Sequence, residues 1–155
     1  MRTTELAVGQ YYHIYNRGVD KRPIVLLPKD RARFLHGMAF FNTVSPIGSI
    51  REHPDVEFDH GGVVQQPPLV NIVCYCLNPN HYHFVLEQVA ERGIERFMHR
   101  LGTGYTKYFN ARHARTGSLL QGPFKAIRID SDAYLLHVSR YVNLNFRVHR
   151  LVGDL

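Results

Sequence analysis

The residues of this sequence whose types and spacing best suit chemistry are the two histidines of His81-Tyr82-His83. In a β-strand, residues i and i+2 point to the same face of the sheet, so both imidazoles would project side by side. Two neutral imidazoles placed in this way can bind a divalent cation and leave coordination positions open for the oxygens of a substrate. The spacing is equally compatible with a structural or solvent-facing pair, so the triplet alone leaves the choice open.

Two cysteines, Cys74 and Cys76, precede the histidines and suggest a second arrangement. Together with His81 and His83 they could in principle form a Cys₂His₂ zinc site. The usual Cys-x₂₋₄-Cys spacing is absent, and cysteines in an apolar strand are more often small core residues. A disulfide between residues two apart in a strand would be strained. We therefore expect free thiols, as in a reducing compartment.

The last predicted helix supplies a further candidate group. Tyr134, Val138, Tyr141 and Asn145 fall on one stripe of that helix. Taken alone, Tyr141 is typical of a core tyrosine. Asn145 is a polar residue one turn beyond it, and its amide oxygen could bind an oxygen-preferring metal. The phenol of Tyr141 would then lie one turn from the ion.

The elements that must position these groups can be predicted from the hydrophobic pattern. Aromatic and β-branched residues predict strands, apolar residues at helical spacing predict helices, and glycine or proline marks the turns. We interpret 44–68, which is rich in glycine and proline, as an irregular insertion loop. Asp30 is a plausible cap of the first helix. The predicted order is strand 11–16, helix from Pro28, strand 69–77, strand 81–88, helix 93–113, extended segment 119–129 and helix 130–145. This order predicts an α+β fold, a ferredoxin-like antiparallel sheet with helices packed on it plus a C-terminal helix.

Length and composition restrict the class of protein. The 155 residues suit one domain, 1–155, and 45% hydrophobic with 21% charged residues argue against general disorder. No apolar run is long enough for a transmembrane helix, so we expect a soluble cytoplasmic protein. The net charge is +6; segment 44–68 carries one arginine against four acidic residues, so the remainder carries +9. Such a basic surface predicts a polyanionic partner, nucleic acid first, although charge alone is also compatible with simple solubility.

Several motifs of this sequence resemble those of a known family. The stretch Cys76-Leu77-Asn78-Pro79-Asn80-His81-Tyr82-His83-Phe84-Val85-Leu86-Glu87 is similar to the signature around the paired histidines of the single-tyrosine HUH (histidine–hydrophobic–histidine) transposases. The similarity is closest to the REP-associated tyrosine transposase branch. Supporting blocks occur in the right order over about residues 11–147, at 13–18, 97–98, 105, 108–110, 121–122, 124–126 and 140–145.

The resemblance implies a site and a reaction. It implies that His81 and His83 hold Mg²⁺ or Mn²⁺, that Tyr141 is the nucleophile and that Asn145 is the third ligand. It further implies metal-dependent cleavage and strand transfer of single-stranded hairpin DNA, such as repetitive extragenic palindromes, through a 5′-phosphotyrosine intermediate. A nucleoid-associated monomer or homodimer would follow. The alternative is a non-catalytic, domesticated relative that binds DNA hairpins without cutting them.

Basic residues are the candidates for DNA contact. Arg92, Arg96 and Arg100 recur every four residues, which lines them along one helix edge and suits phosphate binding. The same pattern would arise from a solvated basic face partly paired with Glu91 or Glu95. The further candidates are Arg17, Lys21, Arg22, Lys125 and Arg128.

Overall fold

The computed structural model describes residues 4–48 and 67–152, with side chains up to Asn145. One antiparallel sheet has four strands in the order β2-β3-β1-β4. This is the strand order of a ferredoxin-like sheet, and the predicted α+β class is confirmed. The elements are β1 (Tyr11–Arg17), the 3₁₀ turn η1 (Val19–Lys21), α1 (Pro28–Phe40), β2 (Val70–Leu77), β3 (His81–Gln88), α2 (Gly93–Arg112), β4 (Lys125–Ile129) and α3 (Asp132–Val152).

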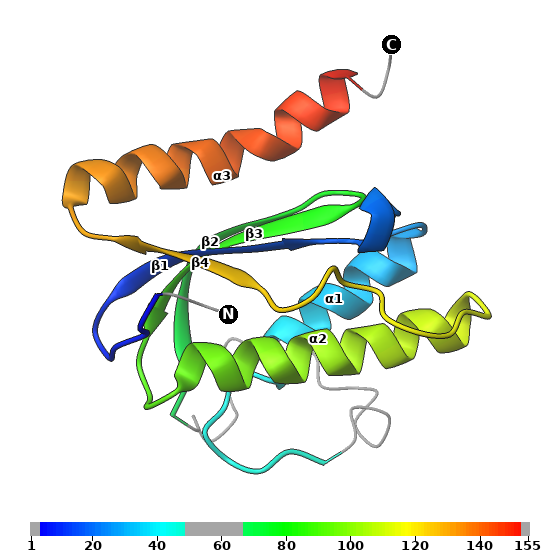
Figure 1. The fold of residues 1–155 in the computed structure, drawn as a ribbon, viewed down its shortest axis with the longest axis horizontal. Helices are drawn as coiled ribbons and strands as arrows, with labels where there is room; N and C mark the ends of the chain where they lie inside the picture. The colour runs from blue at the N-terminus through cyan, green and yellow to red at the C-terminus, as the bar shows by residue number, and fades with distance from the viewer. Residues whose placement is uncertain (1–3, 49–66, 153–155) are drawn as a thin grey trace.

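The helices cover both faces of the sheet. Figure 1 shows α1 and α2 on one face and α3, in orange and red, on the opposite face. Each face has its own apolar cluster: the larger contains Phe34, Phe84 and Phe97, and the smaller, under α3, contains Val85 and Val138. Because side chains alternate along a strand, the residues of β3 divide between the two layers. Burial of two separate apolar clusters therefore fixes which side chains face α3.

Helix α3 is longer than the sequence pattern predicted. We expected its end near Asn145, but it continues to Val152. No glycine or proline stands between Asp132 and Val152, so nothing in that stretch ends the helix. Its start at Asp132 lies close to the predicted start at 130, and the Ser131 hydroxyl caps it by accepting a hydrogen bond from the Tyr134 N–H at 3.1 Å.

Helices α1 and α2 are held together by a close contact and by a buried carboxylate. A Cβ on Gly104 would lie 2.5 Å from the Phe41 ring, so this glycine of α2 allows the end of α1 to approach. Asp30 lies in the first turn of α1, three positions after the N-cap residue. Its carboxylate accepts hydrogen bonds from the N–H groups of Leu26 and Leu27 and pairs with His113 Nε2 at 3.0 Å. Asp30 thus caps α1 from inside the helix, and it also joins α1 to the residue after α2.

Replacing Asp30 by alanine is expected to lower the free energy of unfolding by about 3–5 kcal/mol near pH 7, since it leaves buried donors without their acceptor. Burial alone would raise the pKa of Asp30, but hydrogen bonds from Leu26, His113 and Leu27 hold it below its usual value. The carboxylate therefore stabilises the fold above its ordinary pKa of about 4. That contribution is lost as the pH falls through the lower folded-state pKa.

Urea unfolding of the wild type and Asp30→Ala at neutral and strongly acidic pH measures this difference. The difference in unfolding free energy between the wild type and Asp30→Ala should become smaller in acid. Glu91→Ala, which removes an exposed carboxylate, should change the unfolding free energy little at either pH. A difference that stays constant as the pH falls far below the ordinary pKa of a carboxyl group would contradict the role given to Asp30.

The insertion at 44–68 is only partly described, because 49–66 lie outside the described residues. Residues 44–48 and 67–68 form no helix or strand. Arg96 and Arg100 of α2 donate hydrogen bonds to the backbone carbonyls of Val44 and Thr43 at 2.8 and 2.7 Å. In the described part of the chain, no helix combines the length and the hydropathy that a bilayer span requires.

Candidate functional site

Both histidines of the His81-Tyr82-His83 triplet project toward the face of the sheet that α3 covers. Their neighbours in β3, Tyr82 and Phe84, belong to the core beneath α1 and α2. The ring centroids of His81 and His83 are 5.1 Å apart, so the prediction that both imidazoles lie on one face is confirmed. The alternation of side chains along β3 places them there, because Tyr82, Phe84 and Leu86 fill the larger apolar cluster while Val85 faces α3.

His83 is held by a second histidine from the neighbouring strand. His13 Nε2 and His83 Nδ1 share a hydrogen bond of 2.9 Å, and the two rings stack with an interplanar angle of 20°. Both side chains are buried. Burial lowers the pKa of His13, which favours a neutral imidazole. The contact with His13 engages Nδ1 of His83.

His81 and Asn145 meet through Asn78, which is fully buried in the turn between β2 and β3. The Asn78 amide nitrogen lies 2.8 Å from His81 Nε2 and donates to Asn145 Oδ1 at 2.7 Å. Asn80 Oδ1, which can only accept, lies 2.7 Å from His81 Nδ1. Nδ1 of His81 therefore carries the proton, and the lone pair of Nε2 faces the Asn78 amide. His81 Nε2 and Asn145 Oδ1 therefore contact the same amide nitrogen of Asn78.

Tyr141 lies beside the histidines at the edge of α3. Its ring centroid is 5.7 Å from that of His83 and 6.3 Å from that of His13, with edge-on geometry in both cases. Half of the Tyr141 side chain is exposed, whereas Val138 and Val142 are buried against the sheet. The interpretation of Tyr141 as a core tyrosine is therefore wrong, because the valines and not the phenol supply the apolar contact of α3.

The alternative zinc site finds no support in the geometry. Cys76 packs in the apolar cluster beneath α3, and its thiol contacts Asn78 Oδ1 at 3.5 Å. Among the described side chains, in residues 4–48 and 67–145, no three histidine, cysteine, aspartate or glutamate side chains are grouped as a metal site requires. Neither Cys74 nor Cys76 forms a disulfide, as expected, and burial raises the pKa of the Cys74 thiol.

The donor set is mixed, with two imidazole nitrogens and one amide oxygen, and it could hold a divalent cation. Two imidazoles and one amide oxygen gather on the inner side of α3, and a half-exposed phenol borders them. Such donors suit Mg²⁺ or Mn²⁺ better than a thiolate set would, and three protein ligands leave positions for substrate oxygens. This arrangement could hold a cation next to the hydroxyl of Tyr141.

Some of the predicted DNA-binding residues lie at this site. Arg17, Lys21 and Lys125 line a cavity of about 490 Å³ together with His81 and His83. Arg22 and Arg128 are exposed but do not line it. Arg128 donates a hydrogen bond to Gln10 Oε1 at 2.9 Å instead.

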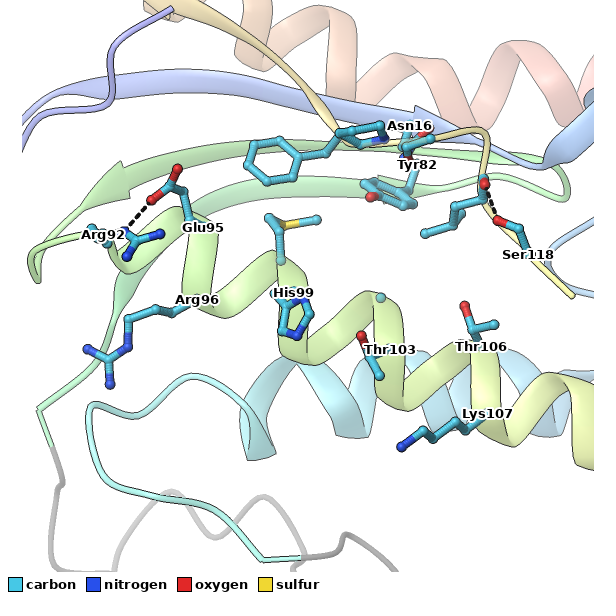
Figure 2. Close-up of a pocket in the computed structure, with 16 residues that line it drawn as sticks. Asn16, Tyr82, Arg92, Glu95, Arg96, His99, Thr103, Thr106, Lys107 and Ser118 are labelled. Carbon is cyan, nitrogen blue, oxygen red and sulfur yellow. Dashed lines mark hydrogen bonds and ion pairs between the residues drawn. The ribbon is translucent and has the colours of Figure 1, made fainter. Parts of the chain in front are cut away.

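The arginines of α2 lie on the opposite face of the sheet. Arg92 and Arg96 line a separate cavity of about 850 Å³, and Figure 2 shows it between α2 and the side chains of Asn16 and Tyr82. Arg92 pairs with Glu95 at 2.8 Å, as the solvated-face interpretation expected. Arg96 and Arg100 hold the loop after α1 by their bonds to its carbonyl groups. The structure therefore does not bring these arginines together with Tyr141, and their contact with DNA stays a prediction.

Two residues of the site were not among the candidates from the sequence. His13 falls in the first predicted strand, and Asn78 reads as an ordinary turn residue. The strand order provides the missing signal for His13, since a ferredoxin-like sheet pairs β1 with β3 and so places their side chains next to each other. No local pattern distinguishes Asn78 from a solvent-exposed asparagine in a turn.

Comparison with known proteins agrees with this architecture. No protein-family model and no curated protein sequence matches the chain. Among solved structures, it is similar to the REP-associated tyrosine transposase bound to a REP hairpin, with 16% identity and a TM-score of 0.59 over 96% of this chain and 73% of that one. A transposase candidate from Deinococcus radiodurans R1 has 11% identity and a TM-score of 0.49, over 94% of this chain and 98% of that one. This chain therefore has the fold of the REP-associated tyrosine transposase, as the resemblance of its sequence motifs implied.

Proposed function

We propose that this protein is a transposase-like enzyme that cuts single-stranded hairpin DNA and rejoins it through a phosphotyrosine link. One observation carries the proposal: within one chain, the half-exposed phenol of Tyr141 lies edge-on to His83, and Asn145 lies one turn further along α3. A tyrosine that reaches the histidines of its own chain supports a site that is complete in a monomer. In a homodimer, each protomer would contain the same complete site. We propose that residues 1–155 form a single domain of this kind of transposase.

His81, His83 and Asn145 would hold Mg²⁺ or Mn²⁺. When bound, the cation would supply Lewis-acid chemistry to the scissile phosphate. The protein residues around these ligands keep them in place. Asn80 fixes the protonation of His81, and His13 engages the far nitrogen of His83. Such outer contacts orient metal ligands in proteins.

Tyr141 would supply the nucleophile. Its Oη attacks the phosphorus in line, the new P–O bond forms to the phenol, and the bond from phosphorus to the 3′ oxygen breaks. The phenolic proton passes to water, which reaches this half-exposed side chain, and the departing 3′ oxygen takes a proton to become a hydroxyl. The products are a 5′-phosphotyrosine and a free 3′-hydroxyl. Because the covalent link remains an ester of phosphate, another 3′-hydroxyl can reverse the step and join two strands without ATP.

Hairpin DNA is the substrate that the comparison favours, because the similar transposase structure is bound to a REP hairpin. The positive charges of Arg17, Lys21 and Lys125 beside the histidines suit a phosphate backbone. With such a substrate the protein would work at the nucleoid. A protein that only bound hairpins would not need a half-exposed phenol edge-on to a hydrogen-bonded pair of buried imidazoles, so this arrangement supports cutting over binding alone.

Replacing His13 by alanine is expected to weaken Mn²⁺ binding about 10–100-fold, because His83 would lose the partner that orients its ring. Titration calorimetry of the DNA-free protein measures this affinity directly. His137→Ala, which removes an exposed histidine of α3, should leave it unchanged. A His13→Ala protein with native circular dichroism and wild-type Mn²⁺ affinity would contradict the orienting role.

The proposed reaction is tested with labelled single-stranded oligonucleotides that form palindromic hairpins with unpaired flanks. Incubation with the protein and Mn²⁺ should give a shortened product and a labelled protein band that survives denaturation. EDTA should abolish both. Cleavage without a protein-linked band would contradict the covalent mechanism, and intact DNA across a broad panel of hairpins would favour a protein that binds without cutting.

A further inference from the structure

The cavity beside His81 and His83 suggests a further role for this site, which rests on the proposed function and extends it. We propose that this cavity is a binding subsite for one nucleotide of the single strand next to the scissile phosphate. In this subsite, Tyr15 stacks on the base, and Arg17, Lys21 and Lys125 bind the adjoining phosphates. The subsite would determine which nucleotide the protein binds beside the cleavage position in the DNA.

Pairing across the sheet brings the necessary side chains into two rows. Tyr15 of β1 pairs with His83 of β3 on one side and with Lys125 of β4 on the other. Arg17, two residues later on the same face, pairs with His81. Adjacent strands are about 4.8 Å apart. Tyr15 and Arg17 are therefore one strand away from the proposed metal ligands, and Lys125 is two strands away.

The charge of the cavity suits a phosphodiester. Three of its lining side chains, Arg17, Lys21 and Lys125, are cationic, and none of the described residues that line it is a carboxylate. Arg17 Nε donates to Gln121 Oε1 at 2.6 Å, which holds the guanidinium at the rim. An arginine has five N–H donors, so this bond uses only one of them. Phosphate oxygens are the acceptors that such groups bind most readily in nucleic acids.

Tyr15 provides the surface for a base. Its ring is partly exposed, and its centroid lies 5.9 Å from that of His83 at an interplanar angle of 24°. Lys125 Nζ lies 6.0 Å from the Tyr15 ring centroid, so a cation already accompanies the ring. Aromatic rings beside cationic side chains are the usual binding elements for single-stranded nucleic acids, in which bases stack on the ring. The cavity volume of about 490 Å³ is within the range that small ligands occupy.

A mononucleotide tests the subsite without any cleavage. Thymidine 3′,5′-bisphosphate, which carries one base and the phosphate on each side of it, is titrated into the full chain and followed by ¹H–¹⁵N NMR. We expect saturable shifts at Tyr15, Arg17 and Lys125, and an affinity about 10-fold weaker in Tyr15→Ala than in the wild type. Tyr15→Phe should bind like the wild type, because it keeps the ring. Tyr75→Ala, which removes an exposed tyrosine outside the cavity, should also bind like the wild type.

Inorganic phosphate separates a nucleotide subsite from a simple anion site. The proposal predicts that phosphate binds about 10-fold or more weakly than the bisphosphate, and that Tyr15→Ala does not alter its affinity. Equal binding of phosphate and the bisphosphate, or equal binding of the bisphosphate by wild type and Tyr15→Ala, would overturn the subsite. Since no DNA is cut in this titration, its failure leaves the covalent reaction of Tyr141 standing, and failure of that reaction does not affect the titration.

Discussion

Replacing Tyr141 by phenylalanine is expected to abolish the covalent protein–DNA adduct and to lower the rate of strand cleavage at least about 1000-fold. The change removes one oxygen atom and keeps the ring that lies edge-on to His83 and His13. The fold and the binding of DNA should therefore be preserved while the nucleophile is lost. The measurement is a single-turnover assay with a labelled hairpin oligonucleotide and Mn²⁺, resolved on a denaturing gel.

Tyr134→Phe is the matched control, since Tyr134 lies two turns earlier on α3 and packs against the apolar cluster beneath that helix. It should form adduct at the wild-type rate. Adduct formation by Tyr141→Phe at a rate within a few-fold of the wild type would show that another residue attacks the phosphate.

Replacing His81 or His83 by alanine is expected to reduce cleavage by about 100–1000-fold and to remove measurable Mn²⁺ binding, because each change deletes one of only three proposed protein ligands. Hairpin binding, measured by fluorescence anisotropy in EDTA, should change less than about three-fold, since most of that affinity comes from phosphate contacts. The two readouts together separate loss of the cation from loss of the DNA.

His99→Ala is the control for these variants, because His99 is exposed on α2, on the opposite face of the sheet. It should retain both activities. Because His83 is buried against His13, circular dichroism must first show that His83→Ala is folded. Folded variants at both positions that still bind Mn²⁺ with the wild-type affinity would contradict the assignment of the two histidines as ligands.

Local pattern was sufficient to predict the elements and the faces of the fold. The strand at 81–88 has the predicted bounds, and asparagine and proline mark the turn that precedes it. The two-residue period of a strand placed His81 and His83 on one face. The order of strands and helices then left few arrangements for the sheet, and the ferredoxin-like one is observed.

Contacts between distant segments could not be predicted from local sequence patterns. His13 and Asn78 gain their roles from residues 70 and 67 positions away in the chain, namely His83 and Asn145. The pattern of Arg92, Arg96 and Arg100 was visible in the sequence, but the carbonyl groups that Arg96 and Arg100 bind belong to an irregular segment. A periodic spacing of charges shows which side chains share a helix edge, and it does not show what faces that edge.

The central claim is that the phenol of Tyr141 forms the covalent bond to DNA. Mass spectrometry of proteolytic fragments from the wild-type adduct, after nuclease digestion of the attached strand, tests it most directly. We expect a single modified peptide that contains Tyr141 and carries a 5′-linked nucleotide on the Tyr141 side chain. A nucleotide attached to a different tyrosine, or to a serine or histidine, would contradict it.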